Sequence, residues 1–210
     1  GERFYSERNP ADMLYLTISS GIGAGVCVDG EVIGGWDGNA GEVGHMTIDP
    51  DGAMTCGCGQ PGHWEAYCSG EGIPAYARFL HDGDPTALPL DEEDFDAAAV
   101  FAHAASDDFA ASVIDRVGEW NALGVANLVE AYAPLVVSVG GAVALNNAEH
   151  VVEPLREQVS EIVFNNVPEV RLTALGEDVI VRGAMASAMT GGTGDRDALA
   201  SVDPGNTEIR

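Results

Sequence analysis

The sequence has 210 residues and is 46% hydrophobic, so it can bury a core and is not expected to be disordered. Its formal net charge is -25 and all nine basic residues are arginine, which argues against binding to nucleic acid or to an anionic membrane. No apolar run approaches the roughly 20 residues of a membrane helix, no signal peptide is visible, and a cytoplasmic location is expected.

The chain opens with a polar segment, residues 1–12, that could be the end of a helix. Met13 to Ile18 is a short apolar run with β-branched members, which predicts a buried strand. Asp29-Gly30 is a hairpin turn signal, and it predicts that strands at 26–28 and 31–33 pair with each other.

A glycine-rich segment, Ser19 to Gly25, lies between and within these strands. Glycines allow backbone N–H groups to approach an anion, so the segment could bind phosphate. It lacks the lysine of a nucleoside-triphosphate loop, and no helix clearly follows it. A tight turn between strands is an equally good interpretation of these residues alone.

Four residues between Gly38 and Gly70 could make a zinc site, namely His45, Cys56, Cys58 and His63. Two thiolates and two imidazoles form a closed tetrahedral set, which indicates a structural metal because no ligand position stays open. Neighbouring glycines allow the short loop to fold around an ion. A Cys56–Cys58 disulfide and a metal-free loop are the alternatives.

Glu42 and Glu65 flank this stretch. Either carboxylate could orient an imidazole ligand or accept hydrogen bonds from neighbouring hydroxyls of a sugar. The spacing alone does not separate these two roles.

The rest of the chain alternates between helices and strands. The patterns predict helices over 64–80 in two pieces, 95–105, 107–132, 151–164 and 179–189, and strands over 135–139 and 170–175. The long helix carries a stripe that is expected to face the core, namely Val113, Val117, Trp120, Leu123, Gly124, Leu128 and Tyr132. The aromatic residues Tyr67, Tyr76 and Phe79 are expected in the core.

Other segments of this half are polar. The acidic run 91–94 could cap the following helix, although a solvated acidic face is the better interpretation. The polar residues from Gly191 onward predict a disordered tail.

Gly140 and Gly141 follow the apolar strand at 135–139 directly. Backbone can approach a ligand closely at the carboxyl end of a parallel strand, so the pair could contact a nucleotide. A tight strand–helix turn explains it equally well.

Together these motifs resemble the ROK family of repressors and sugar kinases. Residues 41–45 (GEVGH) and 56–65 (CGCGQPGHWE) are similar to the family's G-E-x-G-H and C-x-C-G-x-x-G-C-x-E, with His63 in place of the third cysteine. Residues 19–25 resemble its G-T-G-I-G-G-G phosphate loop, with Ser19 and Ala24 replacing two glycines. Residues 137–143 resemble the strand that faces the adenosine, and 175–184 resemble its L-G-x6-G-A pattern.

The resemblance implies roles for particular residues. Glu42, His45 and Glu65 would hold a hexose, with His45 also binding a structural zinc. Ser20, Gly21 and Gly23 would face the phosphates of Mg-ATP, and Gly140 and Gly141 would face its adenosine. The family also implies a homo-oligomer.

The implied fold is an α/β, actin-like ATPase (ribonuclease H-like) lobe with an inserted zinc-binding loop. Residues 1–190 would form this sugar- and nucleotide-binding lobe, with the zinc loop at 41–65 and a tail at 191–210. The D-x-G-G-T phosphate motif and the Asn-Asp pair with the catalytic aspartate do not occur, so both are expected upstream of Gly1 and this polypeptide alone is expected to be inactive.

The implied function is ATP-dependent phosphorylation of a hexose, with glucose favoured. The alternatives are the sugar-responsive lobe of a ROK repressor and a zinc-stabilised sugar-binding module without catalysis. The acidic residues are spread along the whole chain, which predicts a protein adapted to high salt; an ordinary acidic protein is the other interpretation.

Overall fold

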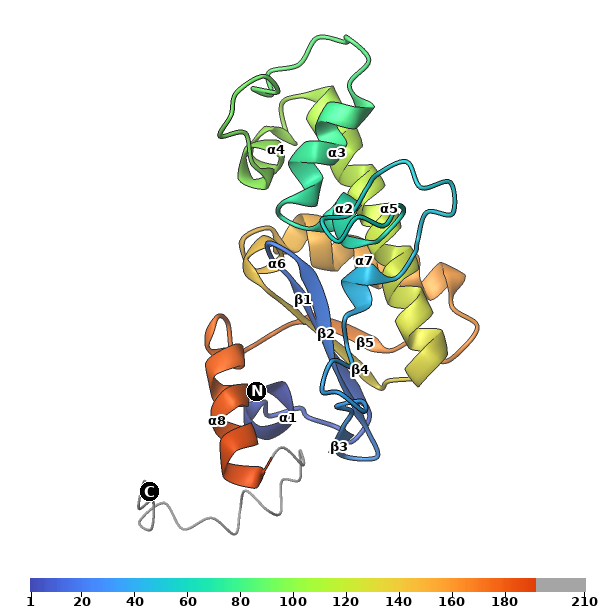
Figure 1. The fold of residues 1–210 in the computed structure, drawn as a ribbon, viewed down its shortest axis with the longest axis vertical. Coiled ribbons are helices and arrows are strands. Elements are labelled where there is room, and N and C mark those ends of the chain that lie inside the picture. Colours follow the sequence, from blue (N-terminus) through green and yellow to red (C-terminus); the bar gives the residue numbers. More distant parts are fainter. Residues whose placement is uncertain (192–210) are drawn as a thin grey trace.

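The computed structural model of this chain describes residues 1–191 and is built on one five-stranded sheet (Figure 1). The strand order is β3-β2-β1-β4-β5. The bounds are Met13–Ile18 for β1, Ile22–Val28 for β2, Glu31–Val32 for β3, Val136–Gly140 for β4 and Glu169–Leu172 for β5. β1 pairs with β2 in antiparallel fashion and with β4 in parallel fashion. The carboxyl ends of β1 and β4 therefore lie together at one edge of the sheet.

The hairpin between β2 and β3 forms as predicted. Asp29 has φ +52° and Gly30 has φ +86°, the pair of positive values that a two-residue turn with a right-handed twist requires. The amide of Asp29 donates to Asp12 Oδ1 at 2.9 Å, which fixes the turn against the segment before β1. β2 begins earlier than predicted, so Gly23 and Gly25 lie within a strand.

The main core lies between the sheet and two helices, α5 (Asp108–Tyr132) and α7 (Ala148–Ile162). Leu14, Leu16 and Ile18 alternate along β1 and are fully buried against this layer. A short helix, α6 (Ala142–Asn146), connects β4 to α7. β4 is buried at every position and its sequence is mostly apolar, whereas Tyr15 and Thr17 of β1 alternate with its fully buried residues and are only half-buried.

The opposite face of the sheet holds a smaller cluster, Met13, Cys27 and Val136. Two helices lie together on this side, α1 (Glu2–Tyr5) and α8 (Asp178–Thr190) (Figure 1). A cavity of about 200 Å³ lies between them and the sheet, away from the candidate site residues. The first helix confirms the helix end predicted before residue 12.

Three short helices lie beyond the edge of the sheet where β1 ends: α2 (Glu65–Cys68), α3 (Gly72–Leu80) and α4 (Ala97–His103) (Figure 1). α2 and α3 confirm the predicted helix in two pieces. The preferred interpretation of residues 91–94 as a solvated acidic face is confirmed, because all four are exposed; α4 is capped instead by Asp96, whose side chain accepts from the amide of Ala99. Phe95, directly before this cap, is buried.

Three residues predicted for the core are exposed instead. The exposed fractions are 42% for Leu123, 37% for Tyr132 and 55% for Phe79, whereas Tyr67 and Tyr76 are buried as predicted. Leu123 and Tyr132 lie at the margin of the stripe on α5, where no second element covers them.

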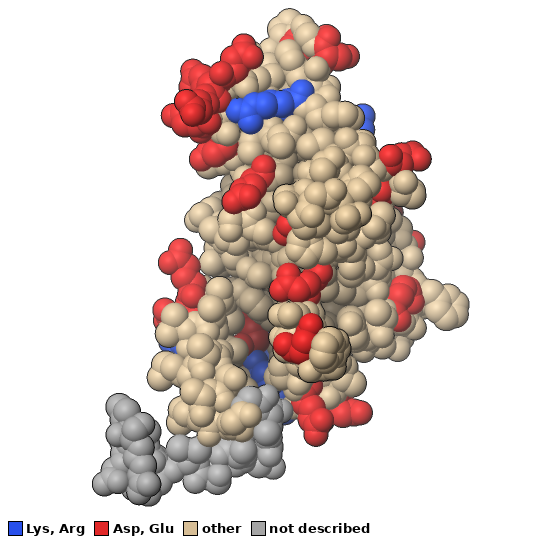
Figure 2. Space-filling view, in the orientation of Figure 1, with Lys and Arg blue, Asp and Glu red and all other residues tan. Residues whose placement is uncertain are grey.

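The visible face carries scattered groups of acidic side chains, separated by uncharged surface, and few basic ones (Figure 2). Every helix within residues 1–191 is too short or too polar to cross a bilayer. The predicted tail lies outside the described residues, except for Gly191, which ends α8 with φ +64°.

Candidate metal and ligand site

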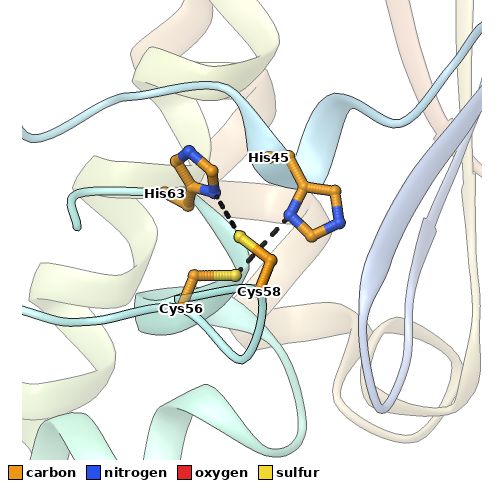
Figure 3. A group of neighbouring side chains, drawn as sticks. All are labelled: His45, Cys56, Cys58 and His63. Carbon is orange, nitrogen blue, oxygen red and sulfur yellow. Dashed lines mark hydrogen bonds between the residues drawn. The ribbon is translucent and has the colours of Figure 1, made fainter. Parts of the chain in front are cut away.

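The four predicted metal ligands converge. His45 ends a short 3₁₀ helix, η1 (Val43–His45), Cys56 and Cys58 lie on one loop, and His63 precedes α2. Their ligand atoms all lie within 4.8 Å of one another, and the side chains point toward a common centre (Figure 3). His45 Nδ1 lies 3.6 Å from Cys56 Sγ, and His63 Nδ1 lies 3.3 Å from Cys58 Sγ.

Tight backbone turns bring these ligands together. The amide of Cys56 donates to the carbonyl of Gln60 at 2.9 Å, and the amide of Gly59 donates back to Cys56 at 2.8 Å. Gly62 has φ +74°, and a Cβ atom there would lie 2.1 Å from the carbonyl oxygen of Asp49. Only glycine fits at this crossing of the loop.

The donor set fits a structural zinc ion. Tetrahedral Zn–S and Zn–N bonds place neighbouring ligand atoms roughly 3.3–3.8 Å apart, close to the two distances found. All four cysteines of the chain are free thiols, which does not support the disulfide alternative. Burial, with a smaller contribution from the Glu65 carboxylate, raises the pKa of the Cys56 thiol to about 12. Without a cation this thiol stays protonated at neutral pH, whereas zinc binds the thiolate.

Glu42 and Glu65 approach His45 from two sides. Glu42 Oε2 lies 3.9 Å from His45 Nε2, and its side chain is 66% exposed. Glu65 Oε1 lies 3.8 Å from His45 Nδ1, and its side chain is 22% exposed. One ring nitrogen of His45 therefore faces the cysteines and Glu65, while the other faces solvent and Glu42.

The predicted nucleotide residues lie in two neighbouring segments: Ser20 and Gly21 in the turn before β2 with Gly23 inside β2, and Gly140 at the end of β4 with Gly141 in the turn after it. A Cβ atom at Gly141, which has φ +87°, would lie 2.4 Å from the carbonyl oxygen of Ile18 at the end of β1. The turn after β4 therefore packs directly against the start of the glycine-rich segment. Gly140 is buried, and a Cβ atom there would lie 2.5 Å from the hydroxyl of Tyr15.

Two clefts open beside these turns. One, of about 280 Å³, is lined by Ser20, Gly21 and Glu65 together with residues of α2 and α3. The other, of about 450 Å³, lies between α4 and α6–α7. Its wall includes Phe101 and His150, whose ring centroids are 5.9 Å apart. Gly23, Gly140 and Gly141 line neither cleft.

A brace of hydrogen bonds between Asp49 and Tyr67 holds the metal loop (residues 45–63), and the sequence did not predict it. Asp49 is buried, and its carboxylate accepts from the hydroxyl of Tyr67 at 2.5 Å, from the amide of Ala53 at 2.8 Å and from the amide of Asp51 at 3.0 Å. Tyr67 also accepts from the amide of Met54 at 2.9 Å. The D-P-D-G sequence at 49–52 signals a turn, but the link to Tyr67 is a tertiary contact.

Replacing Asp49 with asparagine is expected to cost about 1–3 kcal/mol at neutral pH, because an amide turns a donor toward one of these donors. Burial would raise the pKa of Asp49, but the hydrogen bonds from Tyr67, Ala53, Asp51 and Gly52 outweigh it and hold the pKa below 3.8. The stabilisation is therefore present above pH 3.8 and is lost as pH falls through the lower folded pKa. Urea unfolding at pH 7 and pH 3, with chelator in both buffers, checks this.

The control is Asp51→Asn, which makes the same chemical change at an exposed side chain two residues away. It is expected to leave stability within about 0.5 kcal/mol at both pH values. Equal losses for both variants, or a loss for Asp49→Asn that grows toward pH 3, would contradict the brace.

Sequence comparisons find a matching family model and similar proteins. The family model described as "ROK family" matches residues 1–190. A glucokinase from Pyrobaculum calidifontis is 36% identical over 177 residues, which cover 84% of this chain and 57% of that protein. The chain thus spans less than two thirds of the length of this relative.

Two solved structures are similar in fold. A ROK family glucokinase from Streptomyces griseus, in complex with glucose and AMPPNP, has a TM-score of 0.74 and 26% identity over 87% of this chain and 62% of that one. A ROK family transcriptional regulator, a homologue of the E. coli MLC protein, has a TM-score of 0.65 and 26% identity over 78% of this chain and 42% of that one. The predicted fold class, that of the ROK sugar kinases, is confirmed.

Proposed function

This chain belongs to the ROK family, and from that premise we propose that it is the sugar- and nucleotide-binding lobe of an ATP-dependent hexose kinase, with glucose as the favoured sugar. The chain covers 57% of the glucokinase from Pyrobaculum calidifontis, so phosphoryl transfer is proposed for the whole protein and ligand binding for these residues. The expected cofactors are Mg-ATP and a structural zinc ion.

One observation carries the proposal. Glu65 lines the cleft beside Ser20 and Gly21, and one of its carboxylate oxygens lies 3.4 Å from the amide nitrogen of Ile22 in the glycine-rich segment. A sugar bound by Glu42, His45 and Glu65 would therefore lie next to backbone that can face phosphate. Carboxylates suit the sugar because each can accept hydrogen bonds from two hydroxyls.

The remaining residues have supporting roles. Ser20, Gly21 and Gly23 would position the phosphates, and Gly140 and Gly141 the adenosine. His45, Cys56, Cys58 and His63 would hold zinc, which supplies a cross-link that fixes His45 and no chemistry of its own. In such an enzyme, catalysis is mainly positioning and charge stabilisation.

Calorimetry with the zinc-loaded 210-residue chain tests sugar binding. Glucose is expected to bind saturably, and Glu42→Gln is expected to weaken binding about tenfold or more, because it removes a charge-assisted hydrogen bond. Glu93→Gln is the control, since Glu93 is exposed on the loop before α4. Absence of glucose binding, or equal losses in both variants, would contradict the sugar site.

A second candidate is the effector-binding lobe of a regulator, favoured by the likeness to the ROK transcriptional regulator. A non-catalytic sugar-binding module is the third. A coupled assay on the whole protein separates them, because only the kinase forms hexose phosphate and ADP from glucose and Mg-ATP. Glucose binding without that turnover would favour the regulator or the binding module.

A further inference from the structure

We propose that the outward side of α8 is a docking surface for the residues that precede Gly1 in the whole protein. The inference rests on the proposed function, because it requires the longer kinase. Six exposed residues make up this surface, which we call the α8 face: Ile180, Val181, Ala184, Met185, Ala188 and Met189. The side chains are exposed by 66% at Ile180, 63% at Val181, 55% at Met185 and 38% at Met189.

The spacing of these residues places them in one stripe. Residues four positions apart lie on the same side of a helix, and the α8 face consists of the neighbouring pairs 180–181, 184–185 and 188–189. The inward side of α8 is apolar as well, since Val179 and Ala186 are buried. A helix that is apolar all round is typical of one that is buried all round. In the part of the chain that the structure describes, α8 is buried on one side only.

The α8 face carries no charge. Between residues 179 and 190 the only charged residue is Arg182, and its guanidinium pairs with Asp178 at 3.4 Å. The whole chain has 34 acidic residues, yet the visible surface is mainly uncharged where α8 lies (Figures 1 and 2). An exposed apolar stripe on so acidic a protein indicates a contact with other protein atoms.

The first residue of the chain lies against this helix. α1 packs on α8, and a Cβ atom at Gly183 would lie 2.7 Å from the backbone nitrogen of Gly1. Residues bonded to that nitrogen would therefore begin beside α8. The first turn of α1 has no side-chain cap, which leaves its first amide groups available to a preceding turn of helix.

The length of the relatives points to the occupant of the α8 face. The chain covers 57% of the glucokinase from Pyrobaculum calidifontis, so more than a third of such a protein lies outside the match. A second copy of this chain is the weaker candidate, because two chains of net charge -25 repel each other. A segment joined to Gly1 has no such obstacle, since its covalent link holds it near the α8 face at high effective concentration.

Oxidation of methionine by hydrogen peroxide, followed by mass spectrometry, tests the contact in the 210-residue chain and in the whole protein. Met185 and Met189 are expected to oxidise about tenfold or more slowly in the whole protein, because burial shields their sulfur atoms. Met13, which is 2% exposed, is the internal reference and is expected to oxidise slowly in both.

Three results would overturn the inference. The first is equal oxidation of Met185 and Met189 in the two proteins. The second is protection in the 210-residue chain that grows with its concentration, which would assign the α8 face to a second copy. The third is a native protein whose mass is that of the 210 residues alone.

Met185→Glu gives a second readout, because it places a charge on the α8 face and keeps a good helix former. It is expected to lower the melting temperature of the whole protein by about 5 °C or more, and that of the 210-residue chain by less than about 2 °C. Leu123→Glu is the control, since Leu123 is a 42% exposed position of α5, and it is expected to stay within about 2 °C in both. Equal shifts for Met185→Glu in both proteins would contradict the contact.

A coupled kinase assay on the same whole protein separates this inference from the proposed function. Protection of Met185 without formation of hexose phosphate would refute only the kinase. Turnover of glucose with Met185 still open to peroxide would refute only the docking surface.

Discussion

Removal of zinc is expected to destabilise the chain by about 4 kcal/mol or more and to lower its melting temperature by about 10 °C or more. The metal loop between His45 and His63 has few buried apolar side chains of its own, and its turns depend on glycines. The binding energy of an ion held by four protein ligands is therefore folding energy for this segment. Thermal melts with and without chelator, together with metal analysis of the native protein, check the expectation of about one zinc per chain.

Cys56→Ala is expected to reproduce the effect of the chelator and to abolish zinc binding, because it removes the buried thiolate of the set. Cys27→Ala is the matched control. Cys27 is equally buried, but it packs in the small cluster with Met13 and Val136 on the other face of the sheet. It is expected to lose some packing energy and to keep its zinc. Native protein without zinc, and a melting temperature that the chelator does not change, would refute the metal site.

The sequence predicted the sheet well where the signals are local. Met13 to Ile18 forms β1 with the predicted bounds, since a short apolar run with β-branched members suits a buried strand. Asp29-Gly30 forms the predicted turn, since both positions need positive φ. Asp96 was not predicted as the cap of α4, because several neighbouring carboxylates could each cap a helix and no local pattern distinguishes them.

The sequence predicted which residues form the candidate metal cluster, but it did not predict the contacts that link this cluster to the rest of the chain. The spacing of His45, Cys56, Cys58 and His63 indicates a shared ion, and the structure brings their ligand atoms within 4.8 Å. The brace from Asp49 to Tyr67 joins residues 18 positions apart. The link from Glu65 to Ile22 joins residues 43 positions apart. Such pairs depend on how the loop packs over the sheet, and no local pattern specifies them.

The stripe on α5 shows the same limit. A period of 3.6 residues places Leu123 and Gly124 on one broad face, but only one of the two positions meets a partner. A Cβ atom at Gly124 would lie 2.5 Å from the ring of Trp64, so the indole packs against the helix at a position where only glycine leaves room for it. Leu123, the residue before this contact, is 42% exposed. The contact between Trp64 and Gly124 is tertiary, so the helical period alone does not predict it.

Replacing Trp64 with alanine is expected to cost about 3–5 kcal/mol, the range for removing a large buried aromatic side chain. Trp64 is fully buried. In the sequence it directly follows His63, the last of the candidate metal ligands, and directly precedes Glu65. Its indole N–H donates to Asn121 Oδ1 at 2.9 Å, and its ring packs on Gly124 of α5. The same side chain thus fills the core and anchors the metal loop to the longest helix. Urea unfolding of the zinc-loaded variants measures the loss.

Two further variants separate packing from hydrogen bonding. Trp64→Phe keeps most of the ring but leaves the amide oxygen of Asn121, which is 1% exposed, without this donor, and is expected to cost about 1–3 kcal/mol. Trp36→Ala removes an equally large side chain that is 96% exposed, and is expected to stay within about 0.5 kcal/mol of the wild type. A Trp64→Ala variant as stable as Trp36→Ala would mean that the metal ion alone holds the loop on α5. A loss in the expected range even with zinc bound would mean that the ion fixes the shape of the loop, while Trp64 fixes its place on the lobe.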